Sequence, residues 1–216
     1  MRPRWFLPAA LAVAWLGYWG PWLEHPAGAL RLNAYDLSEW VTFLPEVAAG
    51  QLPLSRLAFL IPSACLAVLF GLAVNAGQRG RRRSEHWLRA HLPDTPLGWV
   101  LLALAVLSAL TVFPYYPYIL TAYADPEFRV QFFVAGLALA GAALAVFVPD
   151  DANALVRIGL ALVGAGCAIG NLVVLWPAAA AVGGPIWALG WGWAALLLGF
   201  LAIIVHGWRT IFQPRR

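Results

Sequence analysis

The stretch SRLAFLIPSACLAVLFGLAVNAG (residues 55–77) decides the fold, because Arg56 is its only charged residue. A helix needs about 20 apolar residues to cross the roughly 30 Å of hydrocarbon in a bilayer. The stretch is followed directly by QRGRRR (residues 78–83), which contains four arginines. A long apolar run that ends at a cluster of arginines is typical of a transmembrane helix whose end faces the cytoplasm.

The whole chain has the composition of a membrane protein. Of its 216 residues, 62% are hydrophobic and 11% are charged, and the mean hydropathy is +0.75. Soluble domains carry about 25% charged residues. The chain has no lysine, which excludes chemistry that needs a lysine amine. We predict an all-α fold in which residues 1–216 form a single transmembrane domain.

Five further stretches are similar to residues 55–77 in length and apolar character. The predicted spans are residues 5–23, 55–77, 97–117, 129–148, 154–176 and 184–207. Segments such as Asp94-Thr95-Pro96 and Asp125-Pro126-Glu127 suit helix starts and separate the spans. We predict a bundle of six transmembrane helices. The alternative for the first span is a signal peptide cleaved after Ala12-Val13-Ala14, but the apolar run continues to Leu23, which favours an uncleaved span.

The arginines predict the orientation of the bundle. One side of the six spans carries 11 arginines and four acids, which gives a net charge of +7, and the other carries three arginines and six acids, which gives −3. The positive-inside rule places both termini and the arginine-rich loop in the cytoplasm of a multi-pass protein of the plasma (inner) membrane. The charges serve topology, so no nucleic-acid binding is expected. Four of the arginines are also candidates to bind anionic lipid, namely Arg79, Arg81, Arg82 and Arg83.

Residues 30–50, LRLNAYDLSEWVTFLPEVAAG, fall on the outer side. Four large apolar residues repeat with helical spacing, namely Leu37, Trp40, Val41 and Leu44. We predict a short amphipathic helix over about residues 34–49, with this stripe buried, Trp40 contributing most, and the acids turned toward water. Pro45 would bend or end it. Two interpretations stay open: an interfacial helix that only joins two spans, or a lid or docking surface.

The outer side is also rich in aromatic residues, since it holds all six tyrosines and seven of the 12 tryptophans. Together with the acids they suggest an aromatic, acidic face suited to a cationic or amphiphilic ligand or to a partner. The alternative is an asymmetric aromatic belt with a partner interface. The candidate site residues are Trp19, Trp22, Glu24, His25, Asp36, Glu39, Trp40, Tyr115, Tyr116, Tyr118, Tyr123, Asp125, Glu127, Arg129, Trp187 and Trp191.

The predicted span centres lack ionisable residues, which argues against an ion-coupled transporter or pump. Cys65 and Cys167 are single and lie in apolar runs, and no catalytic motif or metal-binding cluster occurs, so we expect no cofactor and no enzyme activity. Small residues such as the Gly166–Gly170 GxxxG and the pairs Gly136/Ala140 and Ala195/Gly199 suit close helix contacts.

These observations lead to a functional hypothesis. We predict a non-catalytic accessory, assembly or ligand-binding subunit that uses its outer face to bind another membrane protein or an extracytoplasmic partner. The alternative is a small-solute transport component, not ion-coupled, that uses the same face as its entrance.

Overall fold

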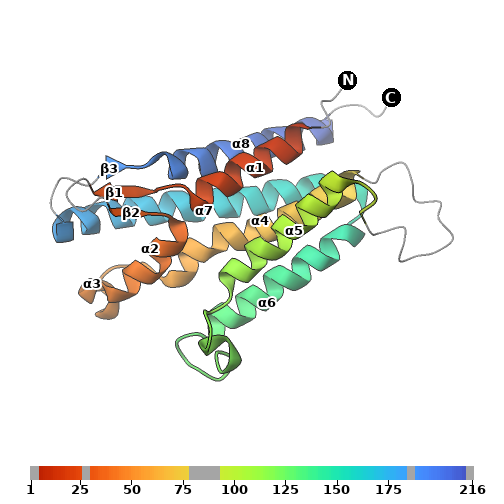
Figure 1. Ribbon diagram of the computed structural model, residues 1–216. Coiled ribbons are helices and arrows are strands. Elements are labelled where there is room, and N and C mark those ends of the chain that lie inside the picture. Colours follow the sequence, from red (N-terminus) through yellow and green to blue (C-terminus); the bar gives the residue numbers. More distant parts are fainter. Residues whose placement is uncertain (1–4, 26–29, 78–92, 184–187, 213–216) are drawn as a thin grey trace.

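The computed structural model describes residues 5–25, 30–77, 93–183 and 188–212, and most of them are helical (Figure 1). Long helices in this part of the chain are α1 (Phe6–Trp19), α4 (Arg56–Gly77), α5 (Pro96–Val112), α6 (Arg129–Leu144), α7 (Asp150–Gly183) and α8 (Trp191–Phe212). Four helical regions are long and apolar enough to cross a membrane, whereas α1 and α5 are apolar but shorter. These four are Arg56–Val74, Arg129–Phe147, Ala152–Ala180 and Trp191–Phe212. The structure thus agrees with a helical membrane protein.

Several helix ends differ from the predicted span ends. Helix α1 stops at Trp19, before Gly20 and Pro21, and α5 stops at Val112, because residue 113 precedes a proline and is extended. Helix α7 does not end at residue 176 but continues through Pro177 to Gly183. The chain after residue 187 then forms a strand, so α8 starts at Trp191 and not at residue 184.

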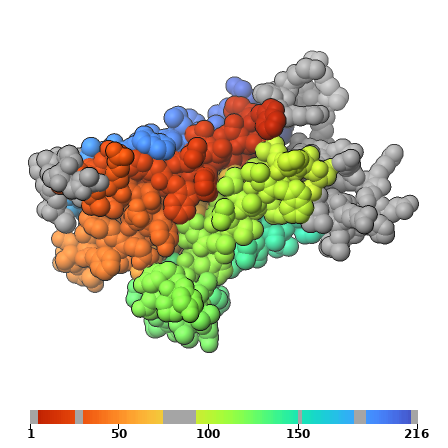
Figure 2. All heavy atoms as spheres, viewed as in Figure 1, coloured from red at the N-terminus to blue at the C-terminus, as the bar shows by residue number. Residues whose placement is uncertain are grey.

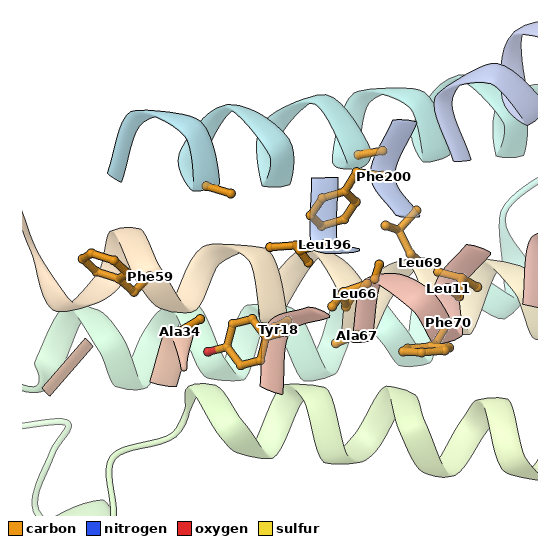
Figure 3. Packing of buried hydrophobic residues seen from close by; sticks show 14 of the residues in the cluster. Leu11, Tyr18, Ala34, Phe59, Leu66, Ala67, Leu69, Phe70, Leu196 and Phe200 are labelled. Atoms are coloured by element: carbon orange, nitrogen blue, oxygen red, sulfur yellow. The ribbon is translucent and has the colours of Figure 1, made fainter. Parts of the chain in front are cut away.

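Helix α4 is the centre of the bundle, since it packs against α1, α5, α6 and α7. Helices α1 and α8 lie side by side along one edge, and α5 and α6 lie along the opposite edge (Figure 1). The start of α1, the end of α4, the start of α5 and the end of α8 share one end of the bundle (Figure 1). Figure 3 shows part of the core between the helices, where Leu11 and Tyr18 of α1 approach Leu66 and Phe70 of α4.

Glycine lets α1 and α8 pack with their backbones in contact. A Cβ atom on Gly199 would lie 2.6 Å from the Cβ of Ala14, and one on Gly17 would overlap the backbone of Leu196. Gly199 is therefore a helix-contact residue, as its spacing from Ala195 suggested. In contrast, a Cβ on Gly136, Gly166 or Gly170 would meet nothing within 4 Å, so these glycines do not bring helices together within the described part of the chain.

A small antiparallel sheet joins two parts of the chain that are far apart in sequence. Strand β1 (Leu23–His25) lies between β2 (Leu30–Leu32) and β3 (Ala188–Leu189). Leu23 pairs with Leu32 on one side and with Leu189 on the other. The all-α prediction missed this sheet, which ties the chain after α1 to the chain before α8.

Residues 34–49 do not form the one continuous helix that was predicted. They fold into α2 (Ala34–Trp40), a 3-10 helix (Val41–Phe43) and α3 (Pro45–Ala48). Asn33 begins α2 with a capping box: its backbone N–H donates to Asp36 Oδ2 at 3.2 Å, and the Asp36 N–H donates to Asn33 Oδ1 at 3.0 Å. The chain is extended at Leu44, next to Pro45, and this breaks the helix.

The apolar stripe of this segment is nevertheless mostly buried. Leu37, Val41 and Leu44 lie in the core. Trp40 is only half-buried and packs against the edge of that core. Trp40 is thus more exposed than Leu37, Val41 and Leu44, although it also packs against the core.

Candidate functional site

The structure brings most of the predicted site residues to one end of the bundle, which holds the sheet, α2 and the segment of residues 113–128 between α5 and α6 (Figure 1). In Figure 2 residues 113–128 form a green projection beside the orange surface of α2 and α3. Glu24 on β1 and Trp191 at the start of α8 lie on the sheet side of α2. The predicted face is therefore divided into a sheet half and a half around residues 113–128. Trp187 and Arg79, Arg81, Arg82 and Arg83 lie outside the described residues.

Arg56, the first residue of α4, is the centre of the second half. Its Nη2 donates a hydrogen bond to Glu127 Oε1 at 3.0 Å. Its Nε lies 3.3 Å from Glu39 Oε1, an ion pair in which the N–H does not point well enough for a hydrogen bond. Its Cζ lies 4.6 Å from the centre of the Phe128 ring, a cation–π distance. The Arg56 side chain is only 11% exposed and that of Glu39 30%, whereas that of Glu127 is 62% exposed, so water screens the pair with Glu39 less than the pair with Glu127.

The acids of the predicted face are largely engaged within the chain. Glu39 and Glu127 contact Arg56. Asp36 completes the capping box of α2, and Asp125 Oδ1 accepts a hydrogen bond from the Glu127 backbone N–H at 2.8 Å. Glu24 lies 4.0 Å from Arg31 in an exposed ion pair. The face consequently offers less unpaired negative charge than the sequence suggested.

Tyr115 and Tyr118 pack near the ring of Phe128, and the segment of residues 113–128 exposes several large side chains. The ring of Tyr118 lies 5.3 Å from that of Phe128, and the ring of Tyr115 lies 5.0 Å from Tyr118 and 6.2 Å from Phe128. Tyr116 is 78% exposed and Tyr123 is 59% exposed. We call the exposed set the aromatic surface; it consists of Tyr115, Tyr116, Tyr118, Leu120 and Tyr123.

The tryptophans of the candidate site have different environments. Trp22 is fully buried, its Nε1 donates to the Gly17 carbonyl at 3.1 Å, and its ring lies 6.3 Å from Phe59, so it is a core residue. Trp19 is exposed and lies 6.1 Å from Tyr35 of α2. Trp191 is exposed at the start of α8. His25 lies on β1, half-buried, and Arg129 is exposed at the start of α6.

Tyr35 lies beside the Arg56 cluster and has a shifted pKa. Burial raises the pKa of its phenol, Glu39 raises it further, and Arg56 opposes both effects. The Tyr35 hydroxyl thus stays neutral at any physiological pH and can act as a hydrogen-bond donor.

Two arginines were not recognised as special from the sequence. In the sequence, Arg56 is one of three arginines on the outer side. Because it starts a span on a side that also carries six acids, its position nevertheless favours an ion pair. Arg157 counted only as an inner-side charge, but it is buried within α7, where its Nε donates to the Asn153 carbonyl at 3.3 Å. The neighbouring Asn153 side chain donates to the Leu72 carbonyl of α4 at 3.3 Å.

The structure also shows how the side chains that could bind a metal ion, and the two thiols, are placed. Within residues 5–25, 30–77, 93–183 and 188–212, no group of three or more His, Cys, Asp or Glu could hold a metal ion. Cys65 is buried and Cys167 half-buried, both as free thiols in apolar helices. Comparisons with protein-family models, curated proteins and solved structures give no match to this chain.

Proposed function

We propose that this chain is a non-catalytic multi-pass membrane protein that acts as an accessory or assembly subunit and binds another membrane protein or an extracytoplasmic partner. The observation that carries the proposal is the aromatic surface on residues 113–128, which stays exposed while the neighbouring acids are paired with Arg56. Exposed aromatic groups of this kind are enriched at protein interfaces. A site for a small cation is less well supported, because Glu39 and Glu127 already hold a cationic side chain.

We propose the same topology that the arginines predict, with six spans and both termini in the cytoplasm of the plasma (inner) membrane. Helix α1 has 14 residues and α5 has 17, which correspond to about 21 and 25 Å. Both are shorter than the roughly 30 Å hydrocarbon core. For α1 the missing length is supplied by Trp22 and Leu23, which are fully buried. Irregular backbone is tolerated at membrane depth where protein surrounds it.

Photo-crosslinking in native membranes tests the proposed function. A photoreactive phenylalanine is placed at Tyr116 or Tyr123 in the aromatic surface and, as a matched control, at Leu137 on α6, which is 73% exposed. We expect a discrete protein adduct from position 116 and lipid adducts alone from position 137. Absence of protein adducts from positions 116 and 123 would contradict partner binding at this surface.

A small-solute transport component, not ion-coupled, is the second candidate. It is favoured by buried hydroxyl groups near the same end of the bundle: Ser63 of α4 donates to the Ser108 carbonyl of α5 at 2.9 Å, and the fully buried Tyr18 of α1 lies beside Ser63. Such groups could line a polar path between α1, α4 and α5. Protein-dependent solute uptake into proteoliposomes that is reduced by Ser63→Ala would favour this function over partner binding.

A further inference from the structure

Arg56 lies where three segments distant in sequence meet. It belongs to α4, Glu39 belongs to α2, and Glu127 and Phe128 end the segment 113–128. The segment has a second attachment at its base, where the Gln131 side chain of α6 donates to the Val112 carbonyl of α5 at 3.0 Å. The start of the segment is therefore tied to α6 by Gln131, and its end, at Glu127 and Phe128, is tied by Arg56 to α4 and, through Glu39, to α2.

Two carboxylates near Arg56 make this contact depend on the positive charge of the Arg56 side chain. Glu39 and Glu127 approach the same guanidinium, at 3.3 and 3.0 Å. Without the positive charge, the attraction to both carboxylates would be lost and the two acids would repel each other. A residue that merely filled space would have neither effect, because its contribution would not depend on the charge of its neighbours.

We propose that Arg56 is a clamp that fixes the position of the segment 113–128 relative to α2. With the clamp closed, the aromatic surface and α2 form one continuous surface of fixed shape. With the clamp open, the segment keeps its tie at Gln131 but loses the one that holds it against Glu39 of α2. The role of this surface in docking rests on the proposed function, whereas the clamp itself is a property of the chain and is tested without a partner.

Electron-spin distance measurements in lipid nanodiscs test the clamp. Spin labels replace Phe43, which is 79% exposed next to α2, and Tyr123, which is 59% exposed on the segment, in a background where Cys65 and Cys167 are alanine. We expect one narrow distance distribution with Arg56 present and its loss, with a shift to longer distances, in Arg56→Gln. Arg31→Gln is the matched control and should leave the distribution unchanged, because Arg31 contacts only the exposed Glu24 at 4.0 Å among its ion pairs in the described chain.

Two further variants separate charge from packing. Arg56→Lys should retain part of the narrow population, because it keeps the charge but not the planar fork. Adding Glu39→Gln and Glu127→Gln to Arg56→Gln removes the repulsion, so the mean distance should return toward that of the native protein, while the distribution should stay broad because the clamp is still absent. If Arg56→Gln destabilises the bundle, Glu127→Gln alone, at an exposed residue, should still broaden the distribution. An unchanged distribution in folded Arg56→Gln and in Glu127→Gln would overturn the clamp, whatever the result of the crosslinking experiment.

Discussion

Leu37 of α2 is fully buried, whereas Phe43, less than two turns further along the chain, is 79% exposed. Leu37→Ala should lower the free energy of unfolding by about 2–5 kcal/mol, because it leaves a cavity between α2 and the bundle. Phe43→Ala, the control, should change it by less than about 0.5 kcal/mol. Unfolding in mixed micelles of increasing denaturing detergent measures both values. Equal effects would contradict the burial of this segment.

The sequence predicts that the acids of this segment, Glu39 among them, turn toward water, where neutralising one costs little. The structure changes this prediction, because Glu39 lies 3.3 Å from a largely buried arginine. We expect Glu39→Gln to lower the free energy of unfolding by about 1 kcal/mol, since Arg56 keeps Glu127 as a partner. Glu24→Gln, in an exposed pair, should have no measurable effect in the same unfolding assay. A neutral Glu39→Gln would show that the contact does not stabilise the fold.

Tyr35 makes the stability of the fold depend on pH in the alkaline range. Its folded-state pKa is raised, chiefly by burial, so the folded protein holds the phenol proton more tightly than the unfolded chain does. The stabilisation is therefore complete below the ordinary tyrosine pKa of about 10 and is lost as the pH rises through the folded-state pKa. We expect Tyr35→Phe to flatten the decline in stability above about pH 10. Unfolding of both proteins in mixed micelles at a series of pH values measures this decline, and identical pH dependences would contradict the assignment.

At the scale of elements, the contact between α1 and α8 depends on the absence of side chains. A Cβ on Gly199 would lie 2.6 Å from that of Ala14, so Gly199→Ala should force the helices apart and cost about 1–3 kcal/mol. Gly166→Ala is the control on α7, where a Cβ would meet nothing within 4 Å. It should be neutral or stabilise the helix by up to about 1 kcal/mol. Unfolding of the two variants gives the comparison, and a neutral Gly199→Ala would contradict the close packing.

The elements also show what a single sequence can and cannot predict. Helices α4 and α6 were predictable, because continuous apolar runs of about 20 residues have few other interpretations. Strands β1 and β3 have three and two residues, too few for a periodic pattern, and Leu23 pairs with Leu189, far away in the chain. The continuation of α7 through Pro177 was missed because proline is normally read as a helix end, while packing inside a bundle can hold a helix together across it.

At the scale of the whole molecule, the proposed topology makes a prediction about access from the two sides of the membrane. Ala124→Cys, exposed in the segment 113–128, should react with an impermeant maleimide in intact cells. Ser84→Cys, in the arginine-rich loop, should react only after the membrane is opened. Both are made in the background without Cys65 and Cys167. Labelling of Ser84→Cys in intact cells would contradict the proposed orientation.

The candidate face was predictable as a location but not as an arrangement. The tyrosines of residues 115–123 were assigned to the outer side because of where they fall between spans, and they do lie together at one end of the bundle. Arg56, Glu39 and Glu127 were not recognised as partners, because ion pairs between distant segments depend on how helices pack. Trp22, near the outer end of the predicted span 5–23, was assigned to the candidate face, but its ring is fully buried and lies 6.3 Å from that of Phe59 of α4, a contact that depends on how the helices pack.

The pairing of Leu23 with Leu189 has a consequence for the order in which the chain is made. A ribosome that adds about 5–20 residues per second needs roughly 10–30 s to proceed from one of these residues to the other. During this interval α1 has left the ribosome, yet the strand and the helix it packs against have not been synthesised. Until α8 is made, the side of α1 that carries Gly17 faces the translocon or lipid. Assembly of this edge of the bundle thus has to wait until α8 has been made, and a premature stop before α8 would leave α1 without this neighbour.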